Sequence, residues 1–429
     1  MKRLPLVFVI MLIIVSASAQ MDTIQTDAGF ISGTISNDKA VHIYKGIPFA
    51  APPVGELRWK APQPVAHWQD IKKCDAFAAS PMQNKPVPFM MYTAPYLIPE
   101  SPISEDCLYL NVWTSAKSAK EKKPVIVWIY GGGFVSGGTA CAIYDGENMA
   151  KKGVVFVSIP YRVGVFGFLA HPELTKESNG KASGNYALLD QIAALHWIQK
   201  NIAAFGGDPD NVTIDGQSAG AFSVNALVAS PLAKGLFKKA IAESGAMFSA
   251  EGNGLSLQAA EKNGEDFLKK INATSAETLR KIPADSLQKL AASFRASPVI
   301  DGYVLPKDVY TIFNNDEQND VAVLTGWNGD DGFPSGNIPD AKKYAEDAKE
   351  KYGVLANEYL QAFPGNTSDE ISKSLFALNR DNLFAWQAYT WQNCKQQKGI
   401  TMYMFIYSTE PHPAKKSMAL FIHLKFHSL

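Results

Sequence analysis

Residues 212–223 place a serine between two glycines, in the sequence VTIDGQSAGAFS. A serine hydroxyl in a Gly-x-Ser-x-Gly pattern can attack a carbonyl carbon if a base takes its proton. That base must lie within hydrogen-bond reach, and a third group must orient it. Ser218 is therefore a candidate nucleophile, and the chain must supply a histidine further along.

The residues on either side of Ser218 favour this interpretation. A short apolar strand ends at Asp215, and residues 221–228 contain no Gly or Pro, so they can form a helix. A strand, a sharp turn and a helix make up a nucleophile elbow, in which glycines flank the serine because the turn leaves no room for Cβ atoms. The alternative is a glycine-rich surface turn, which the neighbouring strand and helix disfavour.

A second glycine-rich segment, residues 130–138, reads YGGGFVSGG and follows a predicted strand. Consecutive glycines expose backbone N–H groups that can converge on a developing oxyanion. The alternatives are a flexible glycine loop or a phosphate-binding loop. The segment lacks the terminal Lys-Ser or Lys-Thr of a P-loop, which disfavours phosphate binding.

The elements that must position these residues alternate between strand-like and helix-like stretches. Apolar runs without polar alternation indicate strands that are covered on both faces, and the alternation with helices predicts an α/β protein with a mostly parallel sheet. Helices are expected at 188–205 and 340–362. The predicted strands are 124–130, 154–161, 212–215, 239–244, 321–326 and 400–407.

Composition narrows the class of protein. The 429 residues are 46% hydrophobic with a formal net charge of zero, which indicates a globular chain and disfavours nucleic acid as a partner. Lys2 and Arg3 precede an apolar stretch, Leu4 to Val15, and then Ala17-Ser18-Ala19. This pattern predicts a signal peptide at 1–19, export to a secreted or periplasmic location, and no stable membrane insertion, because the stretch is shorter than the ~20 residues of a membrane span.

Several longer segments resemble the type-B carboxylesterases, the family that includes the cholinesterases. The serine segment FGGDPDNVTIDGQSAG (205–220) is similar to the family's first signature and EDCLYLNVW (105–113) to its second. The similarity extends from about Asp22 to Tyr407. The other matching segments are 44–65, 130–134, 161–169, 184–191 and 243–246.

The resemblance implies an α/β-hydrolase fold over a single domain, 20–429, and a catalytic triad in the order Ser, acid, His. It implies an oxyanion hole formed by Gly132, Gly133 and Ala219, a small-molecule ester as substrate, and no metal or organic cofactor. Gln217 replaces the glutamate that often precedes the serine in the family.

The resemblance also implies a disulfide between Cys74 and Cys107. From the residues alone, four cysteines in an exported chain allow three connectivities, and the pairing of Cys141 and Cys394 stays open. The aromatic residues between Phe89 and Tyr96 either line a substrate gorge or pack against the loop between Cys74 and Cys107.

The family position of the triad acid falls on Asp331, in the loop GWNGDDGF (326–333) after a predicted strand. The family usually has glutamate there, and either carboxylate can hold an imidazole in the right tautomer. Two solvated aspartates in a turn are the alternative, because Asn-Gly and Asp-Gly pairs are common in turns.

The triad histidine must follow Asp331, which leaves His412, His423 and His427. The family's histidine sits in a stretch similar to Gly-Ala-Phe-His followed by Glu-Ile-Pro, whereas this chain ends in SMALFIHLKFHSL. Suitable codons for 420–427, read one base earlier, spell Ala-Phe-His-Ser-Ser-Glu-Ile-Pro. We therefore expect a natural frameshift or a sequencing error near residues 409–419, which leaves the C-terminal part of the fold missing and His423 as the nearest substitute base.

Two interpretations of function follow. The first is a serine carboxylic ester hydrolase that forms an acyl-enzyme on Ser218. The second is a catalytically impaired relative that serves as a binding scaffold, or a poorly folded product, because the histidine and C-terminal helices are displaced or missing.

Overall fold

The computed structural model describes residues 23–89, 92–180, 183–248, 254–334, 336–396 and 402–407; at 395–396 and 402–407 it describes the backbone alone. The predicted signal peptide, 1–19, lies outside these residues. Within them, each helix is too short or too polar to serve as a membrane span.

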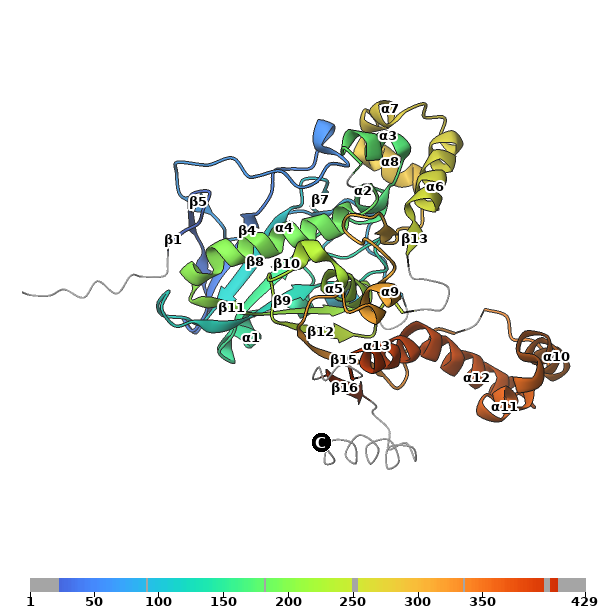
Figure 1. The fold of residues 1–429 in the computed structure, drawn as a ribbon. Helices are drawn as coiled ribbons and strands as arrows, with labels where there is room; N and C mark the ends of the chain where they lie inside the picture. Colours follow the sequence, from blue (N-terminus) through green and yellow to red (C-terminus); the bar gives the residue numbers. More distant parts are fainter. Residues whose placement is uncertain are drawn as a thin grey trace, which may run out of the picture.

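A central sheet runs through the molecule, with nine strands among the described residues in the order β16-β15-β12-β11-β9-β10-β8-β4-β3 (Figure 1). In this order, the strands from β16 to β10 are parallel to one another. β8 pairs antiparallel with β10, β4 pairs antiparallel with β8, and β3 pairs antiparallel with β4. The mostly parallel sheet is therefore confirmed. Its strands are β3 (Thr34–Ile35), β4 (His42–Pro48), β8 (Tyr109–Thr114), β9 (Lys123–Ile129), β10 (Val155–Ile159), β11 (Gly207–Gln217), β12 (Lys239–Glu243), β15 (Ala322–Asn328) and β16 (Met402–Tyr407).

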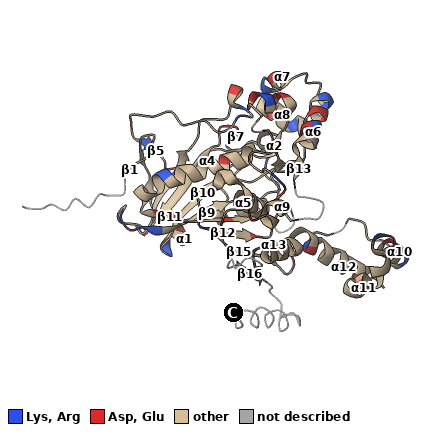
Figure 2. Ribbon diagram, in the orientation of Figure 1, with Lys and Arg blue, Asp and Glu red and all other residues tan. Residues whose placement is uncertain are grey.

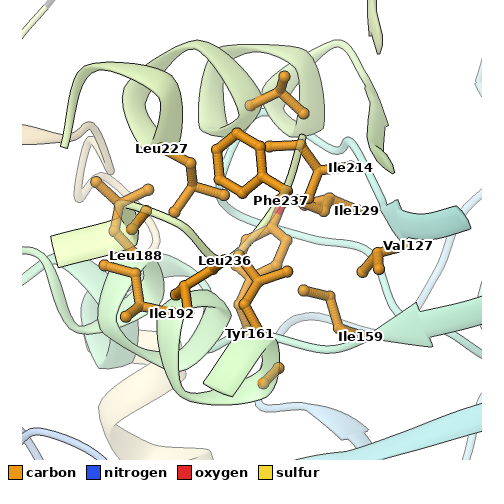
Figure 3. Packing of buried hydrophobic residues seen from close by; sticks show 14 of the residues in the cluster. Val127, Ile129, Ile159, Tyr161, Leu188, Ile192, Ile214, Leu227, Leu236 and Phe237 are labelled. Atoms are coloured by element: carbon orange, nitrogen blue, oxygen red, sulfur yellow. The ribbon is translucent and has the colours of Figure 1, made fainter. Parts of the chain in front are cut away.

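Helices cover both faces of this sheet. α4 and α5 pack on one face, where Val127, Ile214 and Leu227 are fully buried among other aliphatic side chains (Figure 3). α1 packs on the other face against β8 and β10. The helices are α1 (Glu147–Lys151), α2 (Gly164–Phe168), α3 (Pro172–Glu177), α4 (Tyr186–Asn201), α5 (Ala219–Ala229), α6 (Leu257–Lys270), α7 (Ala276–Arg280), α8 (Ala284–Leu290), α9 (Val309–Asn314), α10 (Ala341–Tyr352), α11 (Ala356–Ala362), α12 (Ser368–Arg380) and α13 (Trp386–Gln396).

Shorter elements complete the chain. Small strands pair outside the central sheet, and single turns of 3₁₀ helix join longer elements. The strands are β1 (Thr23–Gln25), β2 (Phe30–Ser32), β5 (Lys72–Lys73), β6 (Ser80–Pro81), β7 (Ile103–Ser104), β13 (Leu255–Ser256) and β14 (Val299–Ile300). The 3₁₀ helices are η1 (Gly55–Leu57), η2 (Ala94–Tyr96), η3 (Ala142–Tyr144), η4 (Ile202–Phe205), η5 (Pro231–Ala233) and η6 (Gly353–Leu355), and η7 (Asp381–Ala385) is a π-helix.

The six strands predicted from the sequence are all present, and each overlaps its predicted range. The helix expected at 188–205 is α4 continued by η4. The helical region expected at 340–362 is two helices, because Gly353 has a φ of +54° and ends α10. Glycine adopts this backbone conformation readily, so the chain turns there instead of extending the helix.

α2, α3, α6, α7 and α8 form a helical cap at one end of the sheet (Figure 1). Its core contains Trp59, Phe166, Phe267, Leu279 and Leu287, all buried. The cap has its own apolar core because α3, α6, α7 and α8 turn apolar residues inward and leave most charged residues to solvent, while α2 is almost entirely buried.

A buried ion pair ties the end of β10 to α4. The Arg162 guanidinium donates to both carboxylate oxygens of Asp190 at 2.7 and 2.8 Å, and the Arg162 backbone N–H donates to the same carboxylate at 2.9 Å. Both side chains are almost completely shielded from solvent. A buried carboxylate with this many donors keeps its charge compensated, so the pair fixes where the chain leaves the sheet.

Candidate active site

Ser218 lies at the sharp turn between β11 and α5. Its φ and ψ are 54° and −122°, a conformation that non-glycine residues rarely adopt. The backbone around it is pinned, because the Ser218 N–H donates to the Glu243 carbonyl at 2.9 Å and the Ser218 carbonyl accepts from the Phe222 N–H at 2.9 Å. The strand, turn and helix expected around this serine are all present.

The glycines around Ser218 are required by close backbone contacts. A Cβ on Gly220 would lie 2.0 Å from the Ile129 carbonyl oxygen, and a Cβ on Gly216 would lie 2.6 Å from the Gly220 carbonyl. Gly131, on the facing loop, would place a Cβ 2.7 Å from the Gln217 carbonyl oxygen. Real Cβ atoms do not approach backbone oxygens this closely, so the helix can begin against the end of β9 only with glycine at these positions.

The glycine-rich loop after β9 lies beside the serine. Gly132 and Gly133 have φ values of 111° and 61°, and the Gly132 carbonyl accepts from the N–H groups of Val135 and Ser136 at 3.1 Å each. Among the described residues, no group accepts a hydrogen bond from the backbone N–H of Gly132, Gly133 or Ala219. Unpaired N–H groups beside a serine, one of them at a helix N-terminus, suit a developing negative charge.

Asp331 follows β15, two strands away from β11 in the sheet. Its Oδ2 accepts a hydrogen bond from the Ser244 hydroxyl at 2.5 Å and from the Asn328 backbone N–H at 3.0 Å. Ser244 follows β12, is buried, and donates its own N–H to the Gly326 carbonyl at 2.8 Å. The structure therefore brings Asp331 to the same edge of the sheet as Ser218 and holds its carboxylate in place.

Sequence reasoning did not identify Ser244 as a functional residue, although the segment ESGA (243–246) was noted. The sequence around a serine at the end of a strand does not show which group its hydroxyl contacts. Only the alignment of β12 beside β15 shows that its hydroxyl meets Asp331.

A cavity of about 600 Å³ opens over Ser218. The glycines at 131–133 form part of its wall, and aromatic side chains form much of the rest. Phe89 and Tyr92 stack with ring centroids 4.9 Å apart, and both line the cavity together with Tyr96, so this aromatic segment forms part of the cavity wall. Burial, and next the Asp331 carboxylate, raise the pKa of Tyr92. The aromatic residues of the wall are Phe89, Tyr92, Tyr96, Tyr144, Phe294 and Phe333.

Comparison with known proteins shows which family this chain belongs to. The sequence profile of the carboxylesterase family matches residues 20–420. The chain belongs to the carboxylesterase family. It is 35% identical over 374 residues to a fumonisin B1 esterase from Sphingopyxis macrogoltabida, a match that covers 84% of this chain and 66% of that protein. It is 34% identical over 415 residues to the para-nitrobenzyl esterase of Bacillus subtilis (strain 168), covering 92% of this chain and 80% of that one.

Solved structures of carboxylesterases have the same fold. A Geobacillus stearothermophilus carboxylesterase superposes with a TM-score of 0.77 and 30% sequence identity, over 91% of this chain and 80% of that one. The α/β-hydrolase fold expected from the sequence is thereby confirmed. The chain spans 66% to 80% of the length of these relatives.

The three candidate bases of this carboxylesterase, His412, His423 and His427, lie outside the described residues. Among the described histidines, His42, His67, His171 and His196, none lines the cavity over Ser218. His171 has a structural task, since its Nδ1 accepts from the Glu173 N–H and caps α3.

The disulfide implied for Cys74 and Cys107 is not present in this structure, where both residues are buried free thiols. The two cysteines contact β4 at different points. The Cys74 carbonyl accepts from the Lys45 N–H, whereas Leu108, next to Cys107, accepts from the Phe49 N–H.

Two carboxyl groups lie on the sheet face directly beneath the elbow. Asp215 is on β11 and Glu243 on the neighbouring β12, where it pairs with Gln217, so the two side chains share one face. The Asp215 Oδ1 is shielded from solvent and has no hydrogen-bond partner among the described residues. Burial, and next the Glu243 carboxyl, raise the pKa of Asp215 from 3.8 to about 8. Burial and the neighbouring carboxyl therefore both favour the protonated form of Asp215.

Gly220→Ala tests the close approach of α5 to β9. The new methyl group would meet the Ile129 carbonyl, so we expect the free energy of unfolding to fall by about 2 kcal/mol or more, measured by chemical denaturation. Gly336→Ala is the matched control, because a Cβ there meets nothing within 4 Å. Equal stability of the two variants would contradict the packing argument.

Asp215→Asn tests the buried carboxyl. A raised folded-state pKa means that stability is lost as pH rises from about 4 towards 8, since the folded protein must bind the proton that the unfolded chain releases. The stability of Asp215→Asn relative to the parent should therefore rise between pH 5 and pH 9, by about 2 kcal/mol or more. Asp210→Asn, at an exposed position, should show no such trend. Parallel pH profiles for Asp215→Asn and the parent would refute the assignment.

Proposed function

We propose that this carboxylesterase hydrolyses carboxylic esters through an acyl-enzyme on Ser218. The observation that carries the proposal is the position of Ser218: a positive-φ turn that lines a cavity together with Gly132 and Gly133, whose N–H groups, like that of Ala219, have no acceptor among the described residues. The named relatives are esterases, which supports the same reaction class for this chain.

In the proposed first step, the Ser218 Oγ attacks the ester carbonyl carbon while a histidine takes the hydroxyl proton. The carbonyl oxygen becomes an oxyanion and accepts hydrogen bonds from the N–H groups of Gly132, Gly133 and Ala219. The carbon–oxygen bond to the alcohol then breaks, and the histidine returns its proton to the leaving alcohol. The acyl group stays on Ser218.

In the proposed second step, water replaces the alcohol. The histidine takes a proton from water, the hydroxide attacks the acyl carbon, and the acid leaves as Ser218 recovers its proton. Asp331 orients the imidazole and stabilises its cation. Ser244 is a positioning residue, because its hydroxyl holds the Asp331 carboxylate. His423 is the proposed base.

The cavity favours an uncharged ester of small or moderate size. Its volume of about 600 Å³ is typical of small-molecule sites, and its aromatic walls favour apolar acyl or alcohol groups. Gln217, beside Ser218, is uncharged at a position where members of the family often have glutamate. The pocket therefore attracts a cationic alcohol group less strongly than a pocket with that glutamate does.

Ser218→Ala tests the nucleophile. Hydrolysis of p-nitrophenyl acetate should fall about 10⁴-fold or more, and labelling by a fluorophosphonate should be lost, because no other hydroxyl occupies the elbow. Ser286→Ala, exposed on α8, should retain both. A folded Ser218→Ala variant that keeps its activity would exclude the mechanism. A parent chain that melts cooperatively, without labelling or hydrolysis, would favour the scaffold interpretation instead.

His423→Ala tests the base. Its loss should lower kcat for p-nitrophenyl acetate about 10³-fold or more, as in other serine hydrolases that lose a triad member, while His412→Ala and His427→Ala keep the parent value. If His412→Ala or His427→Ala is the inactive variant, the base is that residue. If all three stay active, none of them is the base.

A further inference from the structure

A second cavity lies between α6 of the helical cap and residues 293–299. Its volume is about 310 Å³, within the range of sites for small molecules. Ser218 and the glycine loop do not line it. It is therefore a separate cavity from the one over the nucleophile.

Apolar side chains form much of the lining of this cavity, beside polar residues that include Asn263 and Ser297. Phe168, Phe267 and Phe294 form its walls together with Leu255 and Val299. Phe267 and Phe294 meet edge to face with ring centroids 5.7 Å apart. A hydrocarbon chain of moderate length is the kind of group that such walls bind, because its apolar surface leaves water there.

The rim of the cavity carries positive charge. Lys270 and Arg295 line it and are exposed, and the Lys270 Nζ donates to the Ser293 hydroxyl at 2.7 Å. Among the described residues, no ion pair compensates either cation. Asp266 also lines the cavity, but Lys262 and Lys269 pair with it at 2.5 and 3.8 Å. Figure 2 shows both basic and acidic residues along α6, whereas Arg295 follows α8.

Two aromatic side chains connect this cavity to the catalytic one. Phe294 lines both cavities, so the two cavities share this residue. Phe168 lies edge to face with Phe134, at 5.1 Å between ring centroids, and Phe134 directly follows the oxyanion glycines. A molecule in the second cavity therefore contacts Phe294, which also lines the first cavity, and Phe168, which packs on the residue after the glycine loop.

We propose that this cavity binds an amphipathic monocarboxylate, with its alkyl chain against Phe168, Phe267 and Phe294 and its carboxylate between Lys270 and Arg295. The planar guanidinium of Arg295 matches a carboxylate geometrically, and the lysine adds a second donor. A bound chain presses the Phe294 ring towards the catalytic cavity and narrows the space for the acyl group.

This link to catalysis rests on the proposed function. Hydrolysis of a fatty ester releases an acid of this class, so the product of the reaction binds in the second cavity and slows further hydrolysis. Binding itself does not depend on catalysis.

The binding test uses Ser218→Ala and sodium decanoate in isothermal titration calorimetry. We expect saturable binding of decanoate, and binding about tenfold weaker or more for decanol, which has the chain without the charge. Adding Lys270→Glu and Arg295→Glu should weaken decanoate binding at least about tenfold. Adding Lys234→Glu and Lys289→Glu, exposed lysines that do not line the cavity, makes the same change in net charge and should leave binding unchanged.

Thermal melts establish that each variant is folded, and Lys270→Gln with Arg295→Gln replaces the glutamate pair if that pair does not fold. Absence of decanoate binding, equal binding of decanol, or full binding by the Lys270 and Arg295 variants would each overturn the proposal. So would equal weakening by the control pair.

The kinetic test uses the active chain. Decanoate should lower kcat/KM for p-nitrophenyl hexanoate more than for p-nitrophenyl acetate, because the longer acyl group needs the space beside Phe294. The Lys270 and Arg295 variants should lose this effect. Binding without any kinetic effect would refute the feedback and leave the binding site standing, whereas an inactive chain that binds decanoate would refute the proposed function alone.

Discussion

The first turn of α5 packs against the carbonyl end of β9, and the position of every other group in the site depends on that contact. The Gly220 backbone meets the Ile129 carbonyl so closely that no side chain fits between them. Since α5 cannot move away without breaking its contacts to β11 and β12, the turn before it must reverse the chain at a single residue. That residue is Ser218, and its positive φ is the result of this packing.

The parallel sheet positions several other residues of the site relative to this turn. The carboxyl ends of β9, β11, β12 and β15 meet at one edge, which is where open α/β sheets place their sites. Hydrogen bonds link successive strand ends, from Ser218 to the Glu243 carbonyl and from Ser244 to the Gly326 carbonyl. The nucleophile, the donors beside it and the Asp331 carboxylate are therefore held by one continuous backbone network.

Much of this site could be predicted from the sequence because its signals are local. Strands covered on both faces leave uninterrupted Val and Ile runs, and tight turns demand glycine, so the sheet, Ser218 and the glycine loop were all visible. Contacts between distant segments leave no such signal. The hydrogen bond of Ser244 to Asp331, the shared wall at Phe294 and the separation of Cys74 from Cys107 depend on how strands and helices are placed in space.

The separation of the cysteines has a practical consequence for handling the protein. Burial raises the pKa of Cys74 and Cys141 to about 12 and that of Cys107 well above its usual range, so these thiols stay protonated and react slowly. A fold held by glycine contacts and sheet packing has no cross-link for dithiothreitol to break. Production in a reducing bacterial cytosol and storage in reductant are therefore compatible with this architecture, and alkylating reagents have little to modify at these positions.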